Sequence, residues 1–168
     1  DREHKISSRS AFAELAEEVR EAEAFAFDEP LLRFANGAAS PAMDAVMRLA
    51  SDLGFAWGVI PAGVLIFAAL MLLGHVRRGL FFGLAVGGSA LLNLAAKAVF
   101  ARVRPDLWLS FAPETTFSFP SGHAMGSATL AAAVVLLAWR TAWRWPALLA
   151  GVVFAAWVGA SRVYLGVH

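Results

Sequence analysis

Three short groups of basic, hydroxyl and imidazole side chains stand at the ends of apolar stretches. They are Lys97 followed after six residues by Arg104-Pro105, then Pro120-Ser121-Gly122-His123, and then Ser161-Arg162 followed after five residues by His168. Placing one such charge in a membrane span costs about 2.5–3.5 kcal/mol, so cations that remain there indicate a function. Cations and two histidines in this combination suit the binding of an anion and phosphoryl transfer.

Lys97 and Arg104 are seven residues apart and so lie on nearly the same face of a helix. They are about 10 Å apart along its axis, which two long cationic side chains can bridge to share one anion. Pro105 then ends the helix. The alternative is that both are interfacial cations whose charged ends reach the membrane surface, which is common near the ends of spans.

The tetrapeptide 120–123 comes immediately before an apolar segment and predicts the N-terminus of a helix. A helix N-terminus presents backbone N–H groups and the positive end of the helix dipole, and Gly122 allows the backbone to approach an anion closely. We therefore expect a phosphate to bind there. In the alternative interpretation, Ser121 is only an N-cap and His123 is an interfacial polar residue.

Arg162 lies near the end of the last apolar segment. Ser161 and His168 share a helical face, and the side chain of Arg162 is long enough to reach the same site. A buried guanidinium needs an anionic partner, but the last three apolar segments contain no Asp or Glu. A bound anion therefore explains Arg162 more economically than an ion pair inside the protein.

Apolar segments of membrane-spanning length must position these groups. Of the 168 residues, 59% are hydrophobic and 16% are charged, and the mean hydropathy is +0.62. Segments of about 17–21 residues match the hydrocarbon core of a bilayer, and four of them follow one another: 55–73, 80–100, 123–139 and 146–164. The sequence therefore predicts an all-α, polytopic membrane helix bundle with four visible spans.

The charges of the connections predict how the bundle is oriented. Basic residues gather at 75–78 and 140–144, and short cytoplasmic loops are enriched in Lys and Arg. The longer connection 101–122 then faces outward, and its arginines count as ligands rather than as topology signals. In this orientation all three groups lie on the outer side. One imidazole could attack phosphorus there while the other donates a proton to the leaving alcohol.

The first 54 residues are more polar than the rest. Apolar residues recur at helical spacing between Ser10 and Phe27, which predicts an amphipathic surface helix. Ser40-Pro41 resembles an N-cap with proline at the first helical position and predicts a second, short helix. We therefore divide the chain into polar and amphipathic N-terminal helices at the membrane surface, 1–54, and a transmembrane core, 55–168, which we expect to be truncated at both ends.

Together the three groups resemble the signature of the type-2 phosphatidic acid phosphatase superfamily, which also includes vanadium haloperoxidases and bacterial acid phosphatases. Its three parts, K-x6-R-P, P-S-G-H and S-R-x5-H, occur here in order at 97–105, 120–123 and 161–168. The resemblance implies that His168 is the nucleophile and His123 the general acid. It also implies that cations, a hydroxyl and a backbone amide hold the phosphate oxygens: Lys97, Arg104, Arg162, Ser121 and Gly122.

Membrane enzymes of this superfamily have six spans with the site at the outer face, so we expect one further span before Asp1 and one after His168. They also carry an Asp a few residues beyond the nucleophile, which this sequence lacks. Either that residue lies in an omitted tail, or the chain as given is a poor catalyst. The family uses no metal in this reaction, and we expect neither a metal nor another cofactor.

The leading hypothesis is an integral membrane phosphatase that hydrolyses a phosphomonoester or pyrophosphate of a lipid through a phosphohistidine. We expect it in a bacterial inner membrane, among membrane lipids, with its site facing the periplasm or exterior. A net charge of +1 gives no reason to expect nucleic acid binding, and no feature selects an oligomeric state. The alternatives are a phosphatase of soluble sugar phosphates, a non-catalytic anion-binding membrane protein, and a vanadium haloperoxidase, against which the apolar segments argue.

Overall fold

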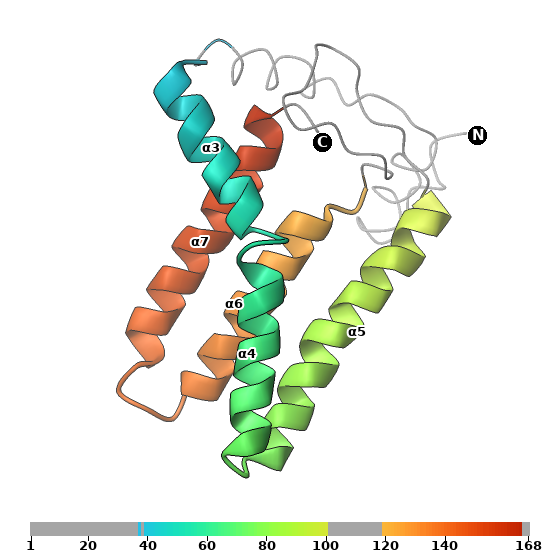
Figure 1. The fold of residues 1–168 in the computed structure, drawn as a ribbon, viewed down its shortest axis with the longest axis vertical. Helices are drawn as coiled ribbons and strands as arrows, with labels where there is room; N and C mark the ends of the chain where they lie inside the picture. The colour runs from blue at the N-terminus through green and yellow to red at the C-terminus, as the bar shows by residue number, and fades with distance from the viewer. Residues whose placement is uncertain (1–36, 38, 101–118, 166–168) are drawn as a thin grey trace, which may run out of the picture.

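Helices form every regular element in the part of the chain that the computed structural model describes, residues 37, 39–100 and 119–165 (Figure 1). These helices are α3 (Pro41–Leu53), α4 (Val59–Leu72), α5 (Val76–Phe100), α6 (Gly122–Ala138) and α7 (Arg144–Tyr164). The all-α prediction is confirmed for these residues. The predicted helix between Ser10 and Phe27, together with Arg104 and His168, lies outside the described residues.

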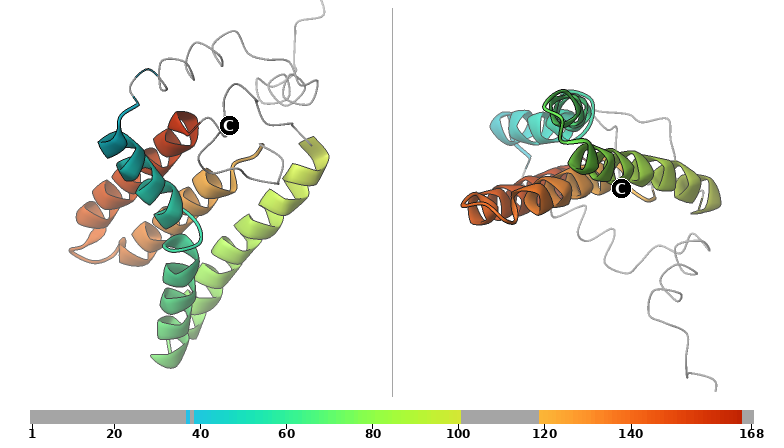
Figure 2. Two further views of the ribbon diagram at one scale, coloured as in Figure 1. Left: turned by 45° about the horizontal axis from the view of Figure 1, so that its top comes forward. Right: turned by 90° about the horizontal axis from the view of Figure 1, so that it is seen from below.

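The four longer helices, α4 to α7, run alternately in opposite directions (Figure 1). Helix α6 packs between α5 and α7, while α4 packs on α5 and α6 and α3 packs on α7. Seen from below, α3 and α4 lie on one face of the row formed by α5, α6 and α7 (Figure 2). Because the direction alternates, the end of α5, the start of α6 and the end of α7 lie at the same end of the bundle.

Helix α3 begins as the sequence predicts. Pro41 occupies its first turn, and the Ser40 hydroxyl accepts a hydrogen bond from the Met43 N–H at 3.2 Å. This side-chain cap satisfies one of the N–H groups that a helix N-terminus leaves without an intrahelical partner. Ala50 and Ser51 are buried, and they mark the side of α3 that packs on α7.

Helix α4 is shorter than the predicted segment 55–73, because residues 54–58 form a tight connection from α3. A Cβ atom on Gly58 would lie 2.1 Å from the carbonyl oxygen of Leu53. A Cβ atom on Gly54 would lie 2.5 Å from Cγ1 of Val158 on α7. Glycine allows the chain to turn closely past Leu53 at position 58 and to approach α7 closely at position 54, and the helix begins at Val59.

The connection from α4 to α5 depends on Gly74, whose φ of 76° lies in the left-handed region that favours glycine. The His75 N–H bonds to the Leu70 carbonyl and the Gly74 N–H to the Met71 carbonyl, which is the Schellman pattern of a helix C-terminus. Helix α5 then starts at Val76, so the basic residues 77–78 lie in its first turn rather than in the predicted loop.

Among the described helices, α5 and α7 are long and apolar enough to cross a membrane, whereas α4 and α6 have 14 and 17 residues. The four predicted spans thus coincide with four helices, of which two reach spanning length. Only 22% of the most apolar stretch of α5 and of α7 is buried inside the protein. Most of their apolar surface therefore faces outward rather than into a core.

The core is small and lies where α4, α5 and α6 meet, around Val59, Phe82, Leu130 and Ala133. Small residues bring the neighbouring helices close together. A Cβ atom on Gly151 of α7 would lie 3.1 Å from the Cβ of Ala131 on α6. Close approach through small residues is the usual way in which membrane helices pack.

Candidate active site

Helix α6 begins at the predicted tetrapeptide. Ser121 is its N-cap and accepts a hydrogen bond from the Ala124 N–H at 3.3 Å, while Gly122 and His123 are the first two helical residues. The predicted helix start is confirmed here. A hydroxyl that accepts one hydrogen bond still carries a hydrogen to donate, so this cap leaves Ser121 able to bind an oxyanion.

Asn93 on α5 fixes the residues that precede α6. Its side chain is 8% exposed, and its Nδ2 donates to the Pro120 carbonyl at 3.2 Å and lies 3.6 Å from Met125 Sδ. A Cβ atom on Gly122 would lie 3.3 Å from Asn93 Oδ1. A side chain at position 122 would crowd Asn93, so Gly122 also favours the close approach of α5 and α6, a role that was not predicted for it.

Lys97 lies one helical turn beyond Asn93, on the same face of α5. Another turn along, the ring of Phe100 meets that of Phe119 edge-on, with 5.1 Å between ring centroids. Since Asn93 and Phe100 both contact the segment before α6, the lysine between them lies on the face of α5 that is turned toward the start of α6. Arg104, its predicted companion, lies outside the described residues.

Arg162 lies in the last turn of α7 and is 2% exposed. Its Nη1 donates to the Ser51 hydroxyl of α3 at 2.6 Å. The hydroxyl of Ser161 is fully buried and donates to the Val158 carbonyl of its own helix at 2.7 Å. The buried guanidinium predicted at this end of α7 is thus present, and a neutral hydroxyl from another helix is among its partners.

His123 packs against Phe55 from the connection between α3 and α4. The two ring centroids are 5.0 Å apart, and the ring planes are inclined by 31°. Phe55 follows only four residues after Ser51, which binds Arg162. One short stretch of chain therefore touches both Arg162 and His123.

Three of these residues, Asn93, Ser51 and Phe55, were missed by reasoning from the sequence. Asn93 carried a usable signal, because an amide inside an apolar helix needs a hydrogen-bond partner. Ser51 and Phe55 carried no such signal, because serine and phenylalanine are common near helix ends. Among the described residues, no three His, Cys, Asp or Glu side chains are placed to hold a metal ion.

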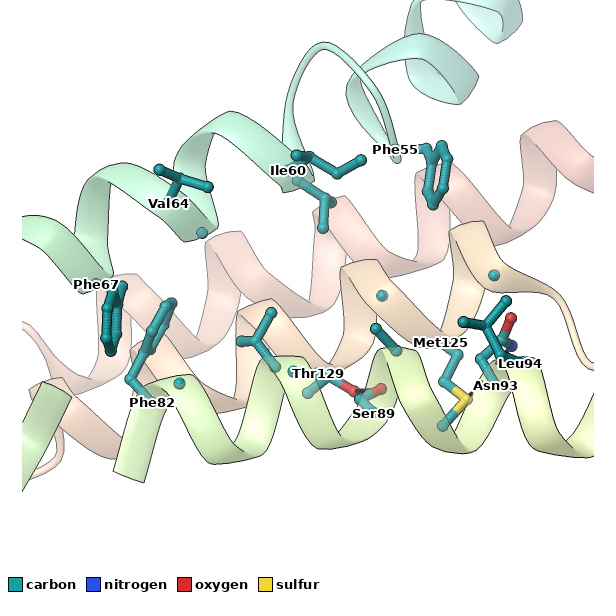
Figure 3. Close-up of a pocket in the computed structure, with 18 residues that line it drawn as sticks. Phe55, Ile60, Val64, Phe67, Phe82, Ser89, Asn93, Leu94, Met125 and Thr129 are labelled. Atoms are coloured by element: carbon teal, nitrogen blue, oxygen red, sulfur yellow. Dashed lines mark hydrogen bonds between the residues drawn. The ribbon is translucent and has the colours of Figure 1, made fainter. Parts of the chain in front are cut away.

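A cavity of about 460 Å³ runs between α4, α5 and α6 and reaches this end of the bundle (Figure 3). Asn93, Met125 and Phe55 lie at the end near the start of α6, and Phe67 and Phe82 lie at the other. Its other lining residues are nearly all apolar or glycine. The polar ones satisfy one another or the backbone, because Ser89 and Thr129 share a hydrogen bond of 2.9 Å and Asn93 bonds Pro120.

Comparisons with known proteins show the family to which the chain belongs. The family model of the PAP2 superfamily matches residues 78–168. Phosphatidylglycerophosphatase B from Bacillus subtilis (strain 168) is 36% identical over 153 residues, covering 84% of this chain and 71% of the relative. Undecaprenyl-diphosphatase from Sulfolobus acidocaldarius is 30% identical over 149 residues, covering 84% and 68%.

The fold has a counterpart of known structure. The crystal structure of a transmembrane PAP2 type phosphatidylglycerolphosphate phosphatase from Bacillus subtilis superposes with a TM-score of 0.78 at 30% identity. The match covers 92% of this chain and 81% of that one. With its helical fold, its three-part signature and these relatives, the chain belongs to the PAP2 superfamily of phosphatases.

Proposed function

We propose that this protein is an integral membrane phosphatase that removes phosphate from a phosphomonoester or pyrophosphate of a lipid. The observation that carries the proposal is the apolar cavity that ends beside Gly122 and Asn93, at the start of α6. A helix N-terminus favours a phosphate, and an apolar groove favours a hydrocarbon chain. A lipid phosphate is a molecule that carries both.

In the proposed reaction His168 attacks phosphorus and the bond to the leaving oxygen breaks. His123 gives its proton to that oxygen, and water then hydrolyses the phosphohistidine to release inorganic phosphate. The phosphate oxygens are held by cations and by donors at the start of α6, which also stabilise the charge of the transition state: Lys97, Arg104, Arg162, Ser121 and the Gly122 amide. No metal takes part in this scheme.

The lining of the cavity favours a lipid over a soluble sugar phosphate. A sugar needs a hydrogen-bonding partner for each of its hydroxyls, but only three residues of the lining, Ser89, Asn93 and Thr129, have polar side chains, and each of them already makes a hydrogen bond within the protein. The names of the relatives indicate two lipid substrates, a phosphatidylglycerophosphate and undecaprenyl diphosphate. Both belong to the substrate class that we propose.

The outer surfaces of the helices support a membrane location. Side chains such as Leu84, Leu91 and Leu149 are 75%, 70% and 68% exposed, and they belong to the two helices of spanning length. Apolar surface on this scale is stable when lipid covers it. We propose that the active-site end faces the periplasm or exterior and that the basic connections at the opposite end face the cytoplasm.

The proposal is tested by measuring the inorganic phosphate that the full-length protein, in lipid micelles, releases from added substrates. The panel compares lipid phosphates with soluble sugar phosphates, and we expect release from lipids to be lost in His168→Ala. His75→Ala, which changes a histidine at the opposite end of the bundle, serves as the matched control and keeps its activity. Preferential release from sugar phosphates would favour that alternative, and phosphate binding without release would leave an anion-binding protein.

A further inference from the structure

The stretch from Ser51 to Phe55, between α3 and α4, contacts two residues of the proposed phosphate site. Ser51 accepts a hydrogen bond from Arg162, and the ring of Phe55 packs on that of His123. The match to the family model begins only at residue 78. Neither Ser51 nor Phe55 is therefore part of the signature that identifies the active site.

The bond between Ser51 and Arg162 is buried, with 6% of Ser51 and 2% of Arg162 exposed. A hydroxyl is neutral, so it can orient the guanidinium without cancelling its positive charge. A carboxylate at the same position would compete with a phosphate for the guanidinium, since both bind it through paired oxygens. The chemistry of Ser51 thus suits a residue that holds Arg162 for an anionic ligand.

Two further contacts fix this stretch against α7. The Tyr164 hydroxyl donates to Asp44 Oδ1 at 2.6 Å, and Asp44 lies seven residues before Ser51 on the same face of α3. Gly54 packs so closely on α7 that a Cβ atom would lie 2.5 Å from Val158 Cγ1. Because Asp44, Ser51 and Gly54 all contact α7, the position of Phe55 relative to α7 is defined.

The contact between Phe55 and His123 restrains the imidazole. At 5.0 Å between centroids and an inclination of 31°, the rings are close enough for an aromatic interaction that favours particular orientations. A general acid works only when its N–H points toward the leaving oxygen. The plane of the His123 ring therefore matters to the reaction, as well as its presence.

We propose that Ser51 and Phe55 are positioning residues of the active site. Ser51 directs the Arg162 guanidinium toward the phosphate, and Phe55 sets the plane of the His123 imidazole. The proposal rests on the proposed function, since it assigns these residues to the same phosphate site. The Ser51 part can nevertheless be tested by binding, without any turnover.

Titration calorimetry of the full chain in micelles with inorganic phosphate tests Ser51. We expect Ser51→Ala to weaken phosphate binding by about tenfold, the order of effect of one hydrogen bond to a charged group, and Ser51→Thr to restore it. Tyr164→Phe is the matched control, because it also removes a 2.6 Å bond between α3 and α7 but leaves Arg162 untouched. Equal weakening in Ser51→Ala and Tyr164→Phe would overturn this part of the proposal.

The leaving group tests Phe55. We expect Phe55→Leu to lower kcat for a soluble short-chain alkyl phosphate by about tenfold or more, because the leaving alkoxide needs the proton of His123. Turnover of 4-nitrophenyl phosphate, whose leaving phenolate needs no proton, changes little, and Phe55→Tyr behaves as the original chain does. An equal loss for both substrates would show that Phe55 does not act through the proton of His123 and would overturn this part of the proposal. If the unchanged chain released no phosphate, the proposed function would fail, while the titration would still decide the role of Ser51.

Discussion

Asn93 joins the helix that carries Lys97 to the segment that carries Ser121 and His123. Its amide, on a side chain that is 8% exposed, donates to the Pro120 carbonyl. A buried carbonyl that loses its partner is destabilised by about 1–3 kcal/mol. The geometry at the start of α6 therefore depends on Asn93, a residue that does not belong to the three-part signature.

We predict that Asn93→Ala lowers the melting temperature in micelles and reduces lipid phosphate turnover at least tenfold. The control is Ser89→Ala, which removes a hydrogen bond from the same helix, to Thr129 of α6, one turn farther from the site. Ser89→Ala should lower the melting temperature but keep turnover within twofold. Equal losses of turnover in the two variants would mean that Asn93 contributes only to packing.

At the scale of the helices, α5 determines how wide the apolar cavity is. Gly87 lines the cavity, and a Cβ atom added there would meet nothing within 4 Å. Its neighbour Gly88 also has open space around it but does not line the cavity. The two glycines therefore form a matched pair on one helix.

We predict that Gly87→Leu raises KM for a long-chain lipid phosphate more than tenfold and that Gly88→Leu changes it less than twofold. Excluding even two methylene groups from apolar contact costs about 1.6 kcal/mol, which is roughly that factor. A soluble short-chain phosphate, assayed in parallel, should be hydrolysed equally by both variants. If both variants had the same KM for the lipid, the cavity would not be the site that binds the lipid chain.

At the scale of the whole molecule, the orientation in the membrane can be measured directly, because the chain contains no cysteine. Single cysteines placed at Ala42 and Thr141 report on opposite ends of the bundle. Ala42 is exposed at the start of α3, near the end of α7, and Thr141 is exposed in the connection from α6 to α7.

We predict that a membrane-impermeant maleimide labels Ala42→Cys in intact cells and labels Thr141→Cys only after the membrane is permeabilised. The basic connection next to Thr141 should be retained in the cytoplasm. The opposite pattern would invert the proposed orientation. Labelling of both positions in intact cells would contradict a bundle that spans the membrane.

The sequence by itself determined the features that depend on neighbours along the chain. The caps at Ser40 and Ser121 rest on hydrogen bonds to residues three positions away, so local spacing predicted where α3 and α6 begin. The apolar runs predicted the four helices in the same way. The alternation of helix direction places the described parts of the three groups at one end of the bundle.

Only the tertiary structure decided which faces of the helices meet. Helices such as α4 and α6 are apolar on every side, so periodicity could not predict their contact faces. The bond from Arg162 to Ser51 joins residues 111 positions apart, and that from Asn93 to Pro120 spans 27. Such pairs depend on how the helices pack, because packing brings together side chains whose separation in sequence carries no signal.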